Sequence, residues 1–137
     1  MSKPRVLFLC TGNSARSQMA EGWLRHFAGD RYEAASAGTD PVGVNPLTVE
    51  VMNEAGVDIA SHYSKKLDGY LGQQFDHVIT VCDQAKQTCP LFPGALHTHH
   101  WSFEDPAAVE GTHAQRLEAF RDIREQIRRR TVEFLEA

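Results

Sequence analysis

Cys10 and Arg16 mark the two ends of a short polar loop close to the N-terminus, with five residues between them. A loop of this kind turns successive backbone N–H groups toward one point, which favours the binding of an anion there. A helix that begins near Arg16 adds the positive end of its dipole, and the planar guanidinium suits a tetrahedral oxyanion. We therefore predict an oxyanion site made by Thr11, Gly12, Asn13, Ser14, Ala15, Arg16 and Ser17.

Cys10 is the expected nucleophile of this site. A cysteine that faces such a positive field ionises more readily than a free one, and the thiolate is its reactive form. The alternative is a buried structural cysteine before an ordinary strand-to-helix turn. Gly12 and Asn13 argue against it, because both tolerate the left-handed backbone that an anion cradle requires. We expect Ser17 to cap the helix, to donate a hydrogen bond to the thiolate, or to do both.

Composition sets the class of protein. The 137 residues, 42% of them hydrophobic and 23% charged, suit a single domain over residues 1–137. A formal net charge of −4 argues against nucleic acid as the main partner. The sequence has no apolar run of membrane-spanning length and no signal-peptide pattern, so we expect a cytoplasmic protein. Three cysteines, an odd number, favour a chemical role over a disulfide framework.

Strand and helix patterns alternate along the chain. Apolar and β-branched runs predict strands at residues 4–10, 32–37, 76–82 and 95–101. The spacing of apolar residues predicts helices over 17–28, 46–55 and 115–135, with a shorter helical piece at 67–74. This alternation predicts an α/β fold, a flavodoxin-like four-stranded parallel sheet with helices on both faces.

Three candidate catalytic residues follow the ends of predicted strands. Cys10 ends the first strand, Cys82 ends the third, and Asp105 follows the fourth. Ligands of such sheets bind beyond the carboxyl ends of the strands, so we expect the three residues to meet at one edge. Asp105 precedes Pro106, and either starts a turn or acts as a general acid.

The motif Cys10-Thr11-Gly12-Asn13-Ser14-Ala15-Arg16-Ser17, with Asp105-Pro106 late in the chain, resembles the low-molecular-weight protein tyrosine phosphatase fold. Within that fold, Cys82-x6-Cys89 resembles the thioredoxin-coupled arsenate reductases, and the resemblance covers nearly the whole chain. It implies that Cys10 attacks arsenate while Asp105 protonates the departing oxygen. Cys82 and then Cys89 would carry the resulting disulfide to thioredoxin. Phosphate or sulfate would fit the same loop, and we expect a monomer.

The resemblance also concerns a cation. Some reductases of this family hold a potassium ion beside the loop, and Asn13, Glu21 and Ser36 match the positions that bind it. Lys65 stands where those members carry an acidic residue, so its ammonium is the alternative to the ion. No other cofactor is expected.

A zinc site is the alternative use of the histidines near Cys82 and Cys89. Strand alternation puts His97 and His99 on one face and His100 on the other. The two cysteines are separated by six residues, more than in usual zinc pairs. We therefore expect no metal there.

Two other functions remain open. A phosphatase would hydrolyse phosphomonoesters through a Cys10 phosphoenzyme, and the later cysteines would only protect Cys10 from overoxidation. A noncatalytic oxyanion-binding or redox-sensing module would not need Asp105. Two departures from the phosphatases are Ala15, where many have a second cysteine, and Ala107-Ala108, where they carry tyrosines that stack on the substrate ring.

Overall fold

The structure, a computed structural model, describes residues 3–82 and 92–137. In this part of the chain, the order of the elements is β1-α1-β2-α2-η1-β3-β4-η2-α3, where η1 and η2 are short 3-10 helices. The strands are β1 (Arg5–Cys10), β2 (Glu33–Gly38), β3 (Phe75–Thr80) and β4 (Ala95–His100). The helices are α1 (Arg16–Ala28), α2 (Pro46–Glu54), η1 (Leu67–Tyr70), η2 (Pro106–Ala108) and α3 (His113–Glu136).

All paired strands run parallel, in the order β2-β1-β3-β4. Strand β1 has a neighbour on each side, and all but its first residue are buried, as expected for a strand covered on both faces. The register sets Cys10 opposite Gly38 on β2 and Leu9 opposite Thr80 on β3. The carboxyl ends of three strands therefore meet where the loop at residues 11–15 begins.

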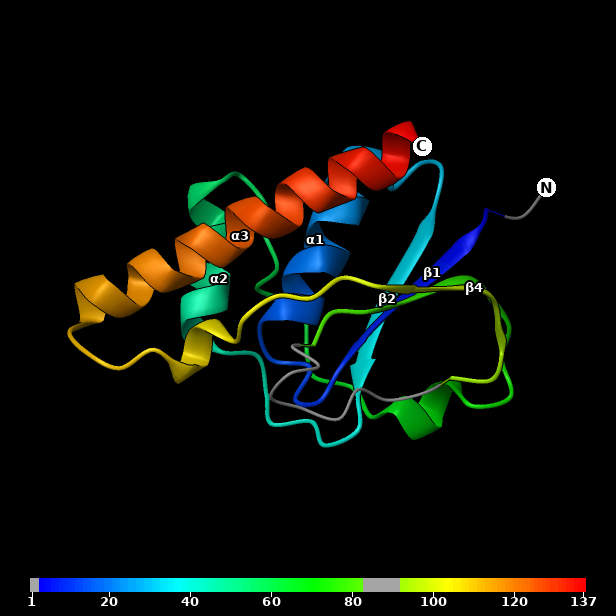
Figure 1. Ribbon diagram of the computed structural model, residues 1–137, viewed down its shortest axis with the longest axis horizontal. Coiled ribbons are helices and arrows are strands. Elements are labelled where there is room, and N and C mark those ends of the chain that lie inside the picture. The colour runs from blue at the N-terminus through cyan, green and yellow to red at the C-terminus, as the bar shows by residue number, and fades with distance from the viewer. Residues whose placement is uncertain (1–2, 83–91) are drawn as a thin grey trace.

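Alternate side chains of β1 enter two different cores. Val6 and Phe8 belong to the larger core, which β1 forms with α1, α2 and α3. Leu7 and Leu9 belong to a smaller core that includes Leu67 of η1. Figure 1 shows the three α-helices together on one side of the strands and η1 on the other. Helical segments thus lie on both faces, with the α-helices on one of them.

The predicted α/β fold with four parallel strands is confirmed, and the element bounds differ by a few residues. Strand β3 ends at Thr80, so Cys82 lies beyond it rather than at its last position. The helical piece predicted over 67–74 is only the short η1, because the chain turns at Gly72 with a φ of 88°.

Helix α3 begins two residues before its predicted start. Thr112 accepts a hydrogen bond from the N–H of Gln115, whose side chain accepts one from the N–H of Thr112. This capping box satisfies N–H groups that the first turn would leave unpaired. Apolar spacing alone could not reveal it. No helix of the described residues is long and apolar enough to cross a membrane.

Candidate active site

The loop between β1 and α1 turns its carbonyl groups outward. Three of them accept hydrogen bonds from backbone N–H groups of residues 40–45. The pairs are Thr11 O with Asp40 N (2.9 Å), Gly12 O with Val42 N (3.1 Å) and Ser14 O with Asn45 N (3.1 Å). In a trans peptide, the N–H after a carbonyl points the opposite way. The N–H groups that follow these carbonyls therefore turn to the inside of the loop, as the predicted anion cradle requires.

Asn13 is the turning point of the loop. Its φ is 47°, and it is the one residue other than glycine with a positive φ in the described chain. This conformation lets the N–H of Asn13 donate to Cys10 Sγ at 3.1 Å. Gly12 does not adopt the left-handed conformation. Its missing side chain serves close packing instead, since a Cβ there would lie 3.2 Å from Cγ2 of Val42.

Cys10 is 2% exposed, and its sulfur receives hydrogen bonds from the loop. The Ser17 hydroxyl lies 2.8 Å from Cys10 Sγ, and Asn13 Nδ2 donates to the same hydroxyl oxygen at 2.8 Å. Because Ser17 Oγ accepts from Asn13, its own hydrogen is free to point at the sulfur. Such donors stabilise a thiolate. The alternative role of Ser17 as helix cap is wrong, because α1 begins at Arg16 and its N-cap is Ala15.

Arg16 and Asp105 face each other at the loop. Arg16 is 5% exposed; its Nη1 donates to the carbonyl of Phe103 at 3.1 Å, and its Nη2 lies 3.8 Å from Asp105 Oδ2. Asp105 Oδ1 accepts from the N–H of Ala107 at 2.9 Å and so caps η2. Asp105 thus starts a turn, which was one of its two predicted roles, and its other oxygen faces the Arg16 guanidinium. Its role as general acid stays a prediction.

A cavity of about 240 Å³ opens above the loop. Its lining residues are Cys10, Thr11, Gly12, Ser14, Ala15, Arg16, Val42, Asp105 and Ala107. Asn13 and Ser17, predicted to bind the oxyanion, do not line it, because both are fully buried behind the loop. Val42 was not among the predicted site residues. It reaches the cavity because its N–H bonds to the carbonyl of Gly12.

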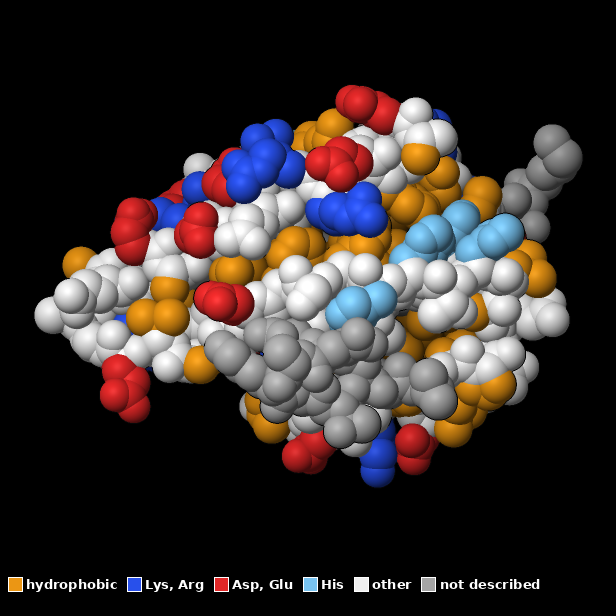
Figure 2. Space-filling view, in the orientation of Figure 1, with side chains coloured by type: hydrophobic (Ala, Val, Ile, Leu, Met, Phe, Trp, Pro, Cys, Tyr) orange, Lys and Arg blue, Asp and Glu red, His pale blue; other side chains and the backbone are white. Residues whose placement is uncertain are grey.

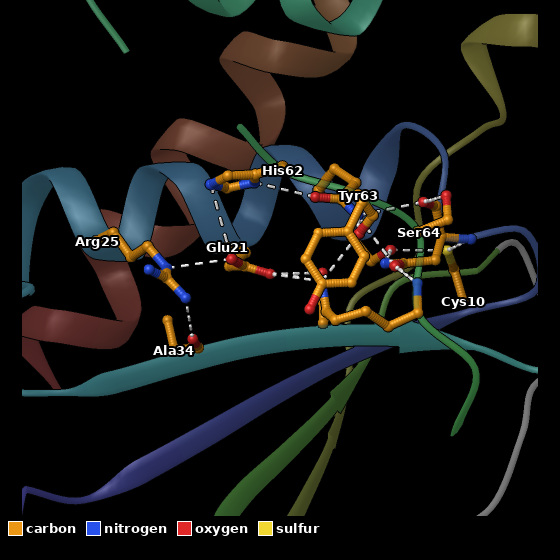
Figure 3. Close-up of polar contacts among 12 residues, drawn as sticks. Cys10, Glu21, Arg25, Ala34, His62, Tyr63 and Ser64 are labelled. Atoms are coloured by element: carbon orange, nitrogen blue, oxygen red, sulfur yellow. Dashed lines mark hydrogen bonds and ion pairs between the residues drawn. The ribbon is translucent and has the colours of Figure 1, made fainter. Parts of the chain in front are cut away.

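A second group of polar residues holds Asn13 from the side away from the cavity; Lys65 was named in the sequence-based prediction, whereas Gln18 and Ser64 were not. Gln18 Nε2 lies 3.0 Å from Asn13 Oδ1 and 3.1 Å from the carbonyl of Tyr63. The Ser64 hydroxyl donates to the carbonyl of Asn13 at 2.7 Å, and the N–H of Lys65 donates to Asn13 Oδ1 at 2.9 Å. Figure 3 shows these contacts beside Cys10. The sequence signal for Gln18 was its polar side chain three residues before Glu21, on the same buried face of the helix.

Glu21 is the buried carboxylate at the far end of this group. Ser36 Oγ donates to it at 2.6 Å, Arg25 Nε lies at 3.1 Å, and Lys65 Nζ at 3.6 Å. His62 Nε2 lies 3.7 Å from Glu21 Oε2, the oxygen that Arg25 also faces. Figure 3 shows Glu21 between Arg25 and His62. Burial lowers the pKa of His62 below its ordinary value, and the neighbouring Glu21 opposes this effect.

Of the two later cysteines, Cys82 is within the described residues and fully buried. The N–H of Val81 donates to the carbonyl of Leu9 at 2.9 Å, so the backbone before Cys82 runs beside the last residues of β1. This is the sheet edge at which Cys10 and Asp105 were expected to meet Cys82. Cys89 lies outside the described residues, and its predicted position stays a prediction.

The histidines of β4 lie on two faces, as strand alternation predicts. His77 Nδ1 is 2.9 Å from His99 Nε2, and the rings of His77 and His97 stack at 5.2 Å. His100 pairs instead with the Thr80 hydroxyl at 2.7 Å. Histidine side chains gather over β4 in Figure 2. No group of three or more histidine, cysteine or acidic residues in the described ranges is arranged to hold a metal.

Comparison with known proteins agrees with this geometry. The curated arsenate reductase of Halalkalibacterium halodurans is 44% identical over 136 residues, which cover 99% of this chain and 98% of that protein. A solved arsenate reductase in the phosphate binding state superposes with a TM-score of 0.79 at 28% identity, covering 97% of both chains. The thioredoxin-dependent arsenate reductase of Corynebacterium glutamicum superposes with a TM-score of 0.72 at 32% identity, over 98% of this chain and 61% of that one. The family model described as low molecular weight phosphotyrosine protein phosphatase matches residues 5–137, and the chain belongs to this family.

Proposed function

We propose that this chain reduces arsenate to arsenite with the thiols of Cys10, Cys82 and Cys89, and that thioredoxin restores the thiols. The observation that carries the proposal is the position of Cys10 in a cavity that Arg16 and Asp105 also line. The relatives named arsenate reductase support the substrate, and the thioredoxin-dependent relative supports the electron donor. Arsenate, like phosphate, is a tetrahedral anion that fits inward N–H groups and a guanidinium.

The first step joins sulfur to arsenic. The Cys10 thiolate attacks arsenic(V), and one As–O bond breaks as a proton reaches the departing oxygen. Asp105 is the proposed general acid, because its carboxylate lines the cavity and lies beside Arg16. The product of this step is a Cys10–arsenate adduct in which arsenic is still pentavalent.

The next step moves two electrons to arsenic, and the step after it exchanges one disulfide for another. The Cys82 thiolate attacks Cys10 Sγ, the S–S bond forms, and the electron pair of the S–As bond leaves with arsenic as arsenite. Cys89 then attacks Cys82, which frees the Cys10 thiolate and leaves a Cys82–Cys89 disulfide. Two thiols are oxidised for each arsenic reduced from the pentavalent to the trivalent state. The dithiol of thioredoxin reduces the remaining disulfide.

We further propose that Lys65, and not a potassium ion, supplies the positive charge beside Glu21. Asn13 Oδ1 already accepts from Lys65 N and Gln18 Nε2, which uses both of its lone pairs. The Lys65 ammonium, 3.6 Å from Glu21 Oε1, would repel a second cation. These residues therefore do not fit a bound potassium ion.

The test is arsenate-dependent oxidation of NADPH in the presence of thioredoxin and its reductase. Wild-type protein is run beside Cys82→Ser and Cys89→Ser, and the proposal expects turnover that both variants lose. The opposite result is no turnover in the wild type, with phosphate release from para-nitrophenyl phosphate that survives both substitutions. That result would favour a phosphatase, although none of the described residues lining the cavity is aromatic.

A further inference from the structure

A continuous row of buried hydrogen bonds joins His62 to Cys10. His62 Nδ1 lies 3.0 Å from Gln18 Oε1, and Gln18 Nε2 lies 3.0 Å from Asn13 Oδ1. Asn13 Nδ2 then lies 2.8 Å from Ser17 Oγ, which lies 2.8 Å from Cys10 Sγ. The side chains of Gln18, Asn13 and Ser17 are fully buried, so water does not compete for these bonds.

Backbone groups fix the direction of every bond in this row. The N–H of Lys65 can only donate, so the Asn13 atom that it meets is the oxygen and Nδ2 faces Ser17. Gln18 meets the carbonyls of Asn13 and Tyr63 with one side of its amide. Carbonyls can only accept, so that side carries the nitrogen, and Gln18 Oε1 faces His62. His62 Nδ1 must therefore carry a hydrogen.

We infer that Gln18 is a positioning residue for Cys10, because it directs this row of donors toward the sulfur. This inference deepens the proposed function and rests on it for the role of the thiolate. Each hydrogen in the row points from His62 toward Cys10. The last one, on Ser17, stabilises a negative sulfur. A reversed amide at Gln18 would place an oxygen against Asn13 Oδ1 and favour reversal of the Asn13 amide as well. The Ser17 hydroxyl would then donate to Asn13 and no longer to Cys10.

Charged groups face both ends of the row. Glu21, Arg25, Lys65 and Asp58 surround His62. At the other end, Arg16 and Asp105 line the cavity with Cys10. None of these groups belongs to the row itself, so substitutions at Gln18 leave these charged groups in place.

The experiment measures the rate at which iodoacetamide alkylates Cys10 as a function of pH, in a Cys82→Ser, Cys89→Ser background. Gln18→Glu keeps the size of the side chain but replaces the donor NH₂ by an oxygen, and its carboxylate adds a negative charge to the row. Gln18→Met removes the hydrogen bonds of Gln18 to His62, Asn13 and Tyr63 and reverses nothing. Thr131→Val is the matched control, because Thr131 is as buried as Gln18 but bonds only to the carbonyl of Ile127 within α3.

The expected result is an upward shift of about one pH unit in the alkylation midpoint for Gln18→Glu, because the thiolate loses a charge-assisted hydrogen bond and faces an added carboxylate. Gln18→Met adds no charge and therefore isolates the loss of the donor; it should shift the midpoint upward by less, since Lys65 N still orients Asn13, and Thr131→Val should leave it unchanged. Thermal unfolding is recorded for all three variants. A merely structural role would lower the melting temperature of Gln18→Met without moving its midpoint, and that outcome would overturn the inference.

A second measurement needs no variant at Gln18. The ¹⁵N chemical shifts of the His62 ring in the wild-type protein report which nitrogen carries the hydrogen. The inference requires hydrogen on Nδ1 throughout the pH range in which the protein is folded; a neutral ring with hydrogen on Nε2 would contradict it. Neither measurement uses arsenate or thioredoxin, so a failure here is separate from a failure of the proposed reduction.

Discussion

Asp105 Oδ2 lies 3.8 Å from Arg16 Nη2, while Oδ1 of the same carboxylate accepts the N–H of Ala107 at 2.9 Å. One oxygen therefore holds the backbone turn and the other faces the anion-binding guanidinium. The Asp105 side chain is 40% exposed, so it can exchange its proton with water between turnovers. A carboxyl held in this way is well placed to protonate an oxygen that leaves an anion bound at Arg16.

Asp105→Asn tests the role of this carboxyl. Asparagine keeps the size of the side chain and an oxygen for the N–H of Ala107, but it carries no acidic proton. We expect arsenate turnover to fall by about a hundredfold or more. Binding of arsenate or sulfate, measured as protection of Cys10 from alkylation, should change only a few-fold.

The control for Asp105→Asn is Asp58→Asn. Asp58 Oδ1 accepts the N–H of Ala60 at 2.9 Å in a similar turn, but Asp58 does not line the cavity above Cys10. Its variant should turn over at the wild-type rate. Equal turnover by Asp105→Asn and the wild type would show that water supplies the proton.

Gly38→Ala should displace the loop at residues 11–15, because the added methyl group would lie against its backbone. A Cβ at Gly38 would clash with the carbonyl oxygen of Thr11 and come within 3.0 Å of the N–H nitrogen of Asn13. Both neighbours are backbone atoms of the loop, so the loop itself must move. We expect a loss of stability of about 1–3 kcal/mol, measured by urea unfolding, and weaker protection of Cys10 by sulfate.

Gly69→Ala is the matched control, because a Cβ at Gly69 meets nothing within 4 Å and Gly69 has no positive φ. It should keep both the stability and the sulfate protection of the wild type. Sulfate protection that survives Gly38→Ala would mean that the loop tolerates displacement from β2.

The sequence was sufficient to predict the parts of the site that are close together along the chain. Cys10 and Arg16 belong to one loop, and their spacing alone indicates an oxyanion site. Ser64 escaped prediction because its partner is distant in sequence: it bonds to Asn13 across 51 residues. Gln18 is near Asn13 along the chain, but its contact with Tyr63 spans 45 residues. No local pattern reports such contacts.

Lys65→Asp should make the stability of the protein depend on potassium. In the wild type the Lys65 ammonium stands 3.6 Å from Glu21 Oε1, so exchanging NaCl for KCl should leave the melting temperature unchanged. Aspartate would remove this cation and add a carboxylate near Glu21 and Ser36. A cation that binds only the folded state then raises the melting temperature, and we expect a higher value in KCl than in NaCl.

Lys66→Asp controls for the change of charge, because Lys66 pairs with Asp68 at the surface, at 3.7 Å. It should show no difference between the two salts. A wild-type melting temperature that rises in KCl would contradict the assignment of the positive charge to Lys65.

The His77–His99 pair should make the protein less stable as the pH falls from about 7.5 to 5.5. Burial is the largest cause that lowers the pKa of both rings below the ordinary value. The charges of His99 and His97 lower the pKa of His77 further, and Asp76 opposes this shift. The charges of His97 and Arg130 lower the pKa of His99 further. The unfolded chain then binds more protons than the folded one below the ordinary histidine pKa, so acid favours unfolding.

His99→Gln removes one titrating ring, and its melting temperature should fall less than that of the wild type across this range. His113→Gln, a substitution at the exposed start of α3, should follow the wild-type curve. If His99→Gln also follows that curve, the acid sensitivity comes from other groups.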